Sequence, residues 1–234
     1  MKSLYCADCP RKYRPIPGDG PQPASILIVG ERPGANEHKY GKVFIGKTGQ
    51  ELNETYLPLA NLTRSRVRIC NAVCCWADNN RTPTDKEIAS CAAHHLPREI
   101  ELTQPRVIIL MGGSACKLVP SIKLDMMHGI PQYAELFDWF GPVVPMYHPA
   151  LGLHESRWMT QLLEDWQSLG HHIREDYWPE PIDPPVTNYR ILRGKEVNDI
   201  QLPPVIAIDT ESHGTTPFSV QISTPSRSRS RRGE

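Results

Sequence analysis

The sequence has no long apolar run, no surplus of charge of either sign and few aromatic residues. Across 234 residues, 26 Lys and Arg balance 26 Asp and Glu, and Phe, Trp and Tyr make up 7%. A membrane-spanning helix needs about 20 consecutive apolar residues, and the N-terminal stretch MKSLYCADCPRKYRPIPG lacks the apolar core of a secretory signal. We therefore expect a cytoplasmic protein with no membrane partner. Since the charge is balanced, any nucleic-acid binding would need a local basic patch.

Seven cysteines are present without a secretory signal, which favours metal ligands or free thiols over disulfides. Cys6 and Cys9 form a C-x2-C pair, and Cys75 and Cys91 follow with fifteen residues between them. Four thiolates suit either zinc or a [4Fe–4S] cluster, and the spacing alone does not separate the two. A chance C-x2-C pair with buried apolar cysteines is the simpler alternative. Because Cys74 adjoins Cys75, either neighbour could be the third ligand.

Between residues 24 and 175, stretches typical of strands alternate with stretches typical of helices. We predict strands at 25–31, 66–75, 105–113 and 141–149, and helices at 48–62, from Thr84 towards Gln104, after Ser114 and at 155–169. Such alternation predicts an α/β fold, a three-layer α/β/α sandwich around a mostly parallel four-stranded central sheet. Ligands of such sheets bind where the strands end. The segments expected along that rim are GERPG (30–34), NAVCC (71–75), GGSA (112–115) and YHPA (147–150).

The stretch GKVFIGKT (41–48) fits the phosphate-loop pattern G-x-x-x-x-G-K-[ST]. A phosphate loop follows a strand directly and uses small residues whose amides close on the ligand. Here the nearest predicted strand ends ten residues upstream, and Val43, Phe44 and Ile45 are bulky. We therefore expect no nucleotide cofactor. An NTPase that pairs this loop with VIAID (205–209) as its metal-binding strand remains an alternative.

Four blocks occur in one order and at one spacing: GERPGANEHKYGKVFIGKTGQEL (30–52), NAVCCWADNNRTPTDKEIASC (71–91), PRVIILMGGSA (105–115) and HPALGL (148–153). With the cysteine pair, they resemble the iron–sulfur, family 4 type of uracil-DNA glycosylase over residues 3–172. The resemblance implies a repair enzyme that flips uracil out of DNA and hydrolyses its N-glycosidic bond, leaving an abasic site. It also implies a [4Fe–4S] cluster held by Cys6, Cys9, Cys75 and Cys91, with zinc as the lesser alternative. A four-cysteine metal module that binds uracil-containing DNA without catalysis is the main rival interpretation.

The resemblance assigns roles to residues of the predicted rim. Glu31 would position the attacking water or stabilise the sugar cation, and His148 would hydrogen-bond uracil O2 as negative charge develops there. Phe44 would stack on the base and Asn71 would read its edge, while Glu37 would lie near the C5 edge that distinguishes thymine. The substrate-binding set implied by the resemblance is Gly30, Gly34, Glu37, Phe44 and Asn71.

Contacts with DNA are expected from the loop after His148 and from Arg32. Leu151 or Leu153 would act as a wedge in the minor groove. Arg32 stands where the family usually has a small residue, so its side chain would crowd the sugar or hold a phosphate. Two further departures, WAD at 76–78 and His154 in place of an arginine, bear on DNA affinity. The covalent uracil-trapping relatives carry a basic insert before the histidine, and its absence predicts turnover without an adduct.

We predict four segments: the glycosylase domain at 1–175, a proline-rich linker at 176–203, an exonuclease-like start at 204–226 and a basic Arg/Ser tail at 227–234. The stretch PPVIAIDTESHGTTPFSVQIST (203–224) resembles the opening of a DEDD-type 3′–5′ exonuclease, with Asp209 and Glu211 as its first acidic pair. Two magnesium ions would need further acidic ligands, so we expect no exonuclease activity. The resemblance implies a monomer in a bacterial or phage-infected cell, whose partners are uracil-containing DNA and, in a longer fusion, a polymerase or exonuclease module.

Overall fold

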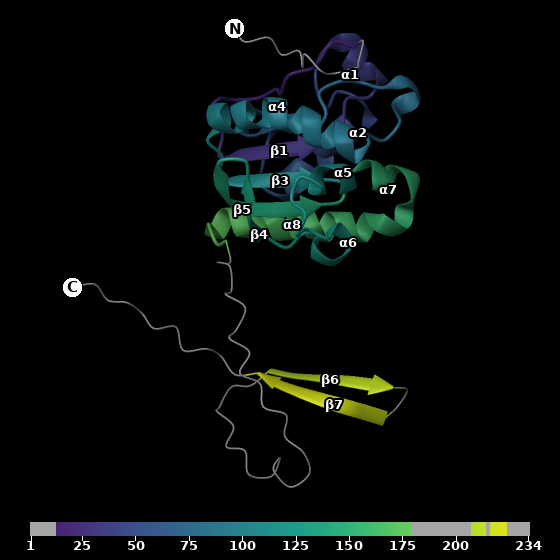
Figure 1. Ribbon diagram of the computed structural model, residues 1–234, viewed down its shortest axis with the longest axis vertical. Coiled ribbons are helices and arrows are strands. Elements are labelled where there is room, and N and C mark those ends of the chain that lie inside the picture. The colour runs from purple at the N-terminus through teal and green to yellow at the C-terminus, as the bar shows by residue number, and fades with distance from the viewer. Residues whose placement is uncertain (1–12, 179–206, 214–215, 224–234) are drawn as a thin grey trace, which may run out of the picture. The chain divides into compact units, whose positions relative to one another are not determined.

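A computed structural model describes residues 13–178, 207–213 and 216–223, and the chain divides into two units, Met1–Pro181 and Ile182–Glu234 (Figure 1). In the second unit, β6 (Ala207–His213) pairs with β7 (Thr216–Ser223) as an antiparallel hairpin in which Asp209 stands opposite Gln221. The predicted linker and basic tail lie outside the described residues, apart from the linker's first residues, 176–178. No helix in the described ranges is long and apolar enough to cross a membrane.

The first unit is built on a five-stranded sheet in the order β2-β1-β3-β5-β4. Its strands are β1 (Ile26–Gly30), β2 (Arg68–Asn71), β3 (Val107–Met111), β4 (Gln132–Leu136) and β5 (Trp139–Met146). Neighbours pair in parallel except for β4, which runs antiparallel to β5 at the edge. The predicted mostly parallel α/β sheet is confirmed, but the predicted count of four strands was wrong. The missing strand, QYAEL, is short and partly exposed, and it returns into β5 through a tight turn at Phe137 with φ +57°.

Helices cover both faces of the sheet. The α-helices are α1 (Ala35–Tyr40), α2 (Lys47–Glu51), α3 (Leu57–Leu59), α4 (Asp85–Thr103), α5 (Gly113–Cys116), α6 (Leu124–Met127), α7 (Ala150–His154) and α8 (Met159–Glu175). The π-helical turn η1 (Leu52–Tyr56) joins α2 to α3, so that the three form one continuous helical segment. Single 3-10 turns are η2 (Arg64–Arg66), η3 (Asp78–Asn80) and η4 (Ser156–Trp158). Figure 1 shows α4 and α8 on opposite sides of the strands. The predicted last helix begins four residues late, because η4 occupies its expected first turn, and it continues to Glu175.

Two apolar cores flank the sheet and follow from the alternation of side chains along its strands. In β1, Ile26 and Ile28 pack with residues of α8, whereas Leu27 and Val29 pack with residues of α4. All five residues of β1 are buried, and so are all five of β3. Strands that are buried on both faces read as unbroken apolar runs, which is why these two were clear in the sequence.

Helix α4 begins where it is predicted to begin, and a capping box at Thr84 fixes its start. The Thr84 side chain accepts a hydrogen bond from the Glu87 N–H, and the Glu87 carboxylate accepts one from the Thr84 N–H. Further along the helix, Glu99 makes a two-bond ion pair with Arg68 of β2, at 2.8 and 3.2 Å, and both side chains are buried. This ion pair fixes α4 against β2 at the edge of the sheet, and so it helps to set the position of Cys91 on that helix.

Candidate functional site

The turns that follow β1, β2, β3 and β5 meet at one edge of the sheet, as the strand order requires. Backbone hydrogen bonds join them: the Ala72 N–H donates to Gly30 O at 2.8 Å, and the Gly112 N–H donates to Met146 O at 2.8 Å. In Figure 1 this edge faces α5 and α7. Four predicted segments of the chain therefore converge on one rim.

Gly30, Phe44 and Asn71 are in direct contact at this rim. A Cβ atom on Gly30 would lie 2.5 Å from Phe44 Cζ and 2.7 Å from Asn71 Oδ1, so only glycine leaves room for both side chains. Asn71 is 3% exposed, and its Oδ1 atom has no hydrogen-bond partner within the described residues. Leaving a buried amide oxygen unpaired costs stability, and such a group suits a bound ligand that supplies the missing donor.

His148 stands beside this group as a neutral imidazole. Its ring centroid lies 6.1 Å from that of Phe44. Desolvation by burial lowers the pKa of His148 to about 4. The Ala150 N–H donates to Nδ1 at 3.4 Å, so we assign the ring proton to Nε2. At neutral pH the residue thus offers an uncharged N–H donor.

Glu31 follows β1 and is held from a second strand end. The Ser114 hydroxyl donates to Glu31 Oε2 at 2.6 Å, although the two residues are 83 positions apart. The sequence placed GGSA on the rim but assigned Ser114 no role, because a lone serine after an apolar strand carries no distinguishing signal.

Glu37 supports the loop that carries Phe44. Its Oε1 atom accepts hydrogen bonds from the N–H groups of Ile45 at 3.1 Å and Gly46 at 2.8 Å. Phe44 itself has φ +54°, in the left-handed region that is strained for an aromatic residue. The carboxylate therefore stabilises an otherwise unfavourable loop conformation, a contact that the sequence did not reveal.

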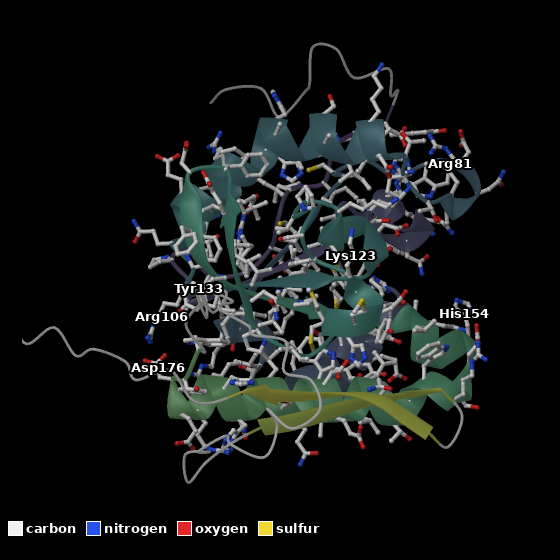
Figure 2. The ribbon with its side chains drawn as sticks, turned by 60° about the horizontal axis from the view of Figure 1, so that its bottom comes forward. Arg81, Arg106, Lys123, Tyr133, His154 and Asp176 are labelled. Atoms are coloured by element: carbon white, nitrogen blue, oxygen red, sulfur yellow. The ribbon has the colours of Figure 1, made fainter. Side chains whose placement is uncertain are left out.

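The residues predicted to touch DNA differ in accessibility. On α7, Leu153 is 43% exposed, whereas Leu151 packs against the apolar core. The Arg32 side chain is only 3% exposed and its Nη1 donates to Arg81 O at 2.9 Å, so the predicted phosphate contact of Arg32 does not fit this conformation. The guanidinium is turned inward, towards the loop that carries Arg81. Figure 2 shows Arg81 and His154 at the outer edge of this side.

A cluster of sulfur and imidazole ligands lies next to the rim. The Sγ atoms of Cys74 and Cys91 and a ring nitrogen of His95 all lie within 4.8 Å of one another. The Cys74 N–H donates to Cys91 Sγ at 3.3 Å. Hydrogen bonding with the Cys74 side chain, followed by the influence of His95, lowers the pKa of the Cys91 thiol below its usual range, although desolvation by burial opposes this. These soft ligands suit a transition metal. Of the predicted four ligands, Cys91 belongs to this cluster, Cys75 is the neighbour of Cys74, and Cys6 and Cys9 lie outside the described residues.

Comparisons with known proteins point to one family. The model of the uracil DNA glycosylase superfamily matches residues 17–167. A type-4 uracil-DNA glycosylase of Thermotoga maritima is 35% identical over 181 residues, covering 73% of this chain and 91% of the relative. One from Pyrobaculum aerophilum is 41% identical over 169 residues, covering 68% and 85%. A DNA polymerase of Bacillus phage SP01 is 27% identical over 158 residues, which is 67% of this chain and 16% of the polymerase.

Proposed function

The chain belongs to the type-4 uracil-DNA glycosylases, and from this membership we propose how its own residues excise uracil from DNA. The observation that carries the proposal is the buried Asn71 amide, whose unpartnered oxygen adjoins Phe44. A base extruded from the stack needs a π face and a polar edge partner. Phe44 supplies the π face and Asn71 the polar edge partner, and the two side chains adjoin each other beside Gly30.

Recognition follows from the hydrogen-bonding capacity of Asn71. Its Oδ1 accepts the N3–H of uracil and its Nδ2 donates to O4, whereas cytosine presents an acceptor at N3 and a donor at its amino group. Phe44 stacks on the ring, and base–aromatic stacking contributes about 1–3 kcal/mol. In the amide orientation of this structure, both hydrogen bonds form with uracil and neither forms with cytosine, so Asn71 in this orientation selects uracil.

Bond cleavage places negative charge on the leaving base. As the bond between C1′ and N1 breaks, its electron pair departs with uracil and the charge spreads to O2. The Nε2–H of His148 donates to that oxygen and keeps its proton, because the neutral ring acts as a dipole rather than an acid. A preorganised donor of this kind lowers the barrier by roughly 3 kcal/mol.

Glu31 completes the reaction on the sugar side. Its carboxylate stabilises the positive charge that develops on the sugar and accepts a proton from the water whose oxygen bonds to C1′. The departing uracil anion then takes a proton from solvent, and Glu31 returns to solvent the proton that it accepted from the water. The products are free uracil and an abasic site, with all atoms of one water molecule added.

For the metal site, we propose a [4Fe–4S] cluster bound by Cys6, Cys9, Cys75 and Cys91. The segment just after Cys9 supports this ligand set, because Tyr13 O lies 3.4 Å from Cys75 Sγ and the Ile16 N–H donates to Cys74 O. Cys91 lies in the cluster of soft ligands with Cys74 and His95, and binding of a metal would require its thiolate form. When bound, the cluster supplies a covalent link between chain segments, and no step of the hydrolysis needs it.

The DNA interface and the larger assembly are also proposals. The exposed Leu153 on α7 would enter the minor groove, while Leu151 holds the helix to the core. The similarity to a phage DNA polymerase supports a relationship to fused replication enzymes. Asp209 and Glu211 lie two residues apart on β6, and we propose them as the first acidic pair of an exonuclease-like start.

The function is tested with a labelled oligonucleotide that carries one uracil, followed by alkaline cleavage of any abasic site. We expect strand scission only with uracil, and none with thymine or cytosine at the same position. Binding to uracil-containing DNA without an abasic product would instead favour the non-catalytic module.

Purified without oxygen, the protein should show the broad absorption of a thiolate-bound cluster at roughly 400 nm, whereas a colourless protein with one zinc would contradict the cluster.

A further inference from the structure

We propose that Ser114 is a positioning residue for Glu31 and that the turn between β3 and α5 sets the distance between the two sides of the reaction. The inference rests on the proposed roles of Glu31 and His148. Its structural basis is the 2.6 Å hydrogen bond from the Ser114 hydroxyl to Glu31 Oε2. Ser114 is 4% exposed, so water competes little for this bond.

A serine in the first turn of a helix ordinarily bonds to nearby backbone groups. At α5 the N-cap position is Gly112, no side chain caps the helix, and the Ser114 hydroxyl reaches instead to another strand end. Glu31 is half-buried at the rim and can be solvated without help. Because water can solvate the Glu31 carboxylate, the main effect of this bond on Glu31 is to restrict the orientation of its side chain.

The same turn touches the opposite side of the site. Gly112 has φ +91°, and a Cβ atom there would lie 3.2 Å from His148 Cβ. One turn thus contacts His148 through Gly112 and Glu31 through Ser114, two residues later. The segment between these contacts is too short to stretch, so the turn fixes the donor for the leaving base relative to the carboxylate for the sugar.

The bond also assigns different tasks to the two carboxylate oxygens. Oε2 is occupied by Ser114, while Oε1 has no hydrogen bond to any described residue and remains available for water or the sugar. Misplacing a reacting group by about 1 Å can cost a hundredfold in rate. Loss of the hydroxyl should therefore lower the rate of cleavage without weakening the binding of the base.

The test is single-turnover cleavage and equilibrium binding to an uncleavable uracil analogue in the full-length protein. Ser114→Ala should lower the cleavage rate by about tenfold to a hundredfold and leave the dissociation constant within about twofold. Ser114→Thr keeps the hydroxyl and should recover most of the rate. Ser121→Ala removes an exposed hydroxyl just beyond α5 and is the matched control, with no change expected.

A double-mutant cycle with Glu31→Ala separates positioning from general stability. If Ser114 acts through Glu31, Ser114→Ala has no further effect once Glu31 is removed. An equal loss in both backgrounds, or a Ser114→Ala protein as active as the wild type, would overturn the inference. Glu31→Ala could cleave too slowly to measure. In that case, a Ser114→Thr rate as low as that of Ser114→Ala would overturn the inference, because the retained hydroxyl would have recovered no activity. A wild-type protein that fails to cleave uracil DNA would overturn the proposed function instead.

Discussion

Single residues in this site owe their chemistry to burial. The imidazole of His148 is kept uncharged by desolvation, and the amide of Asn71 is held without a partner for its oxygen among the described residues. Both conditions cost folding stability and both favour a bound uracil, which is the usual relation between stability and function at a pre-organised site. Predictions at this scale therefore concern the separation of binding from rate, and the dependence of stability on pH.

Replacing His148 and Phe44 should affect different steps. His148→Ala should lower the single-turnover rate by about a hundredfold while binding to an uncleavable uracil analogue stays nearly constant, because the charge on O2 exists mainly in the transition state. Phe44→Ala should cost about 1–3 kcal/mol of binding. Rates and dissociation constants of the two variants are measured side by side. If His148→Ala lost binding and rate equally, the histidine would be a structural loop residue.

The low pKa of His148 predicts a pH effect on stability. In the unfolded chain the ring titrates near 6.5, and in the folded protein its pKa is about 4. The unfolded state therefore binds the proton first, so the stability attached to this group is complete above about pH 6.5 and is lost as the pH falls towards 4. The loss amounts to roughly 3 kcal/mol. Urea unfolding of wild type and His148→Gln from pH 7.5 to 4.5 should show a smaller decline in the variant, and parallel curves would contradict the assignment.

At the scale of elements, the loop between α1 and α2 depends on Glu37. Glu37→Ala removes two hydrogen bonds to the loop that holds Phe44 at positive φ, so it should weaken uracil binding much as Phe44→Ala does. Glu37→Gln keeps an oxygen acceptor and should lose less. Binding of the uncleavable analogue is the measurement. The alternative role of Glu37, exclusion of the C5 methyl group, predicts instead that Glu37→Ala cleaves thymine from DNA.

The attachment of α4 to β2 should dominate the stability of the first unit. Glu99→Ala leaves the buried Arg68 guanidinium without its carboxylate, and such a change costs about 3–5 kcal/mol. Arg106 and Asp176, which point towards each other at the surface in Figure 2, provide the control. Asp176→Ala should leave the unfolding midpoint unchanged, since exposed ion pairs contribute little. The measurement is chemical denaturation of both variants. Similar unfolding midpoints for Glu99→Ala and Asp176→Ala would refute a dominant role of the buried ion pair.

The sequence predicted those helices and strands whose residue pattern allows only one structure, and it missed those that depend on contacts with distant segments. The continuous apolar runs of β1 and β3 have one physical meaning, and both strands are confirmed, as is the helix that starts at Thr84. Strand β4 was missed because QYAEL alternates weakly and gains its conformation from pairing with β5. The inward turn of Arg32 and the bonds made by Glu37 and Ser114 join distant segments, and no local pattern encodes such contacts.

For the whole molecule, the division into two units predicts that uracil excision belongs to the first. Every contact of the rim described above lies within residues 13–178. A protein ending at residue 181 should therefore keep the single-turnover rate and the dissociation constant for uracil DNA within about twofold, because compact units with their own core fold independently. The comparison is made with the full-length chain at the same salt concentration. A large loss of rate would show that residues 182–234 contribute to the site.

The fully buried strands behind the rim have a consequence for hydrogen exchange. Every residue of β1 and β3 is shielded, and the turns that carry Glu31 and Ser114 begin where these strands end. Amides in such positions open only when much of the molecule unfolds. Because uracil DNA binds only the folded protein, it should slow exchange at all of these strand amides by one common factor, while the loop around Phe44 and α7 gain further protection by direct contact. The cost of forming the complex then falls on the nucleotide, which must leave its stack to reach a site already in place.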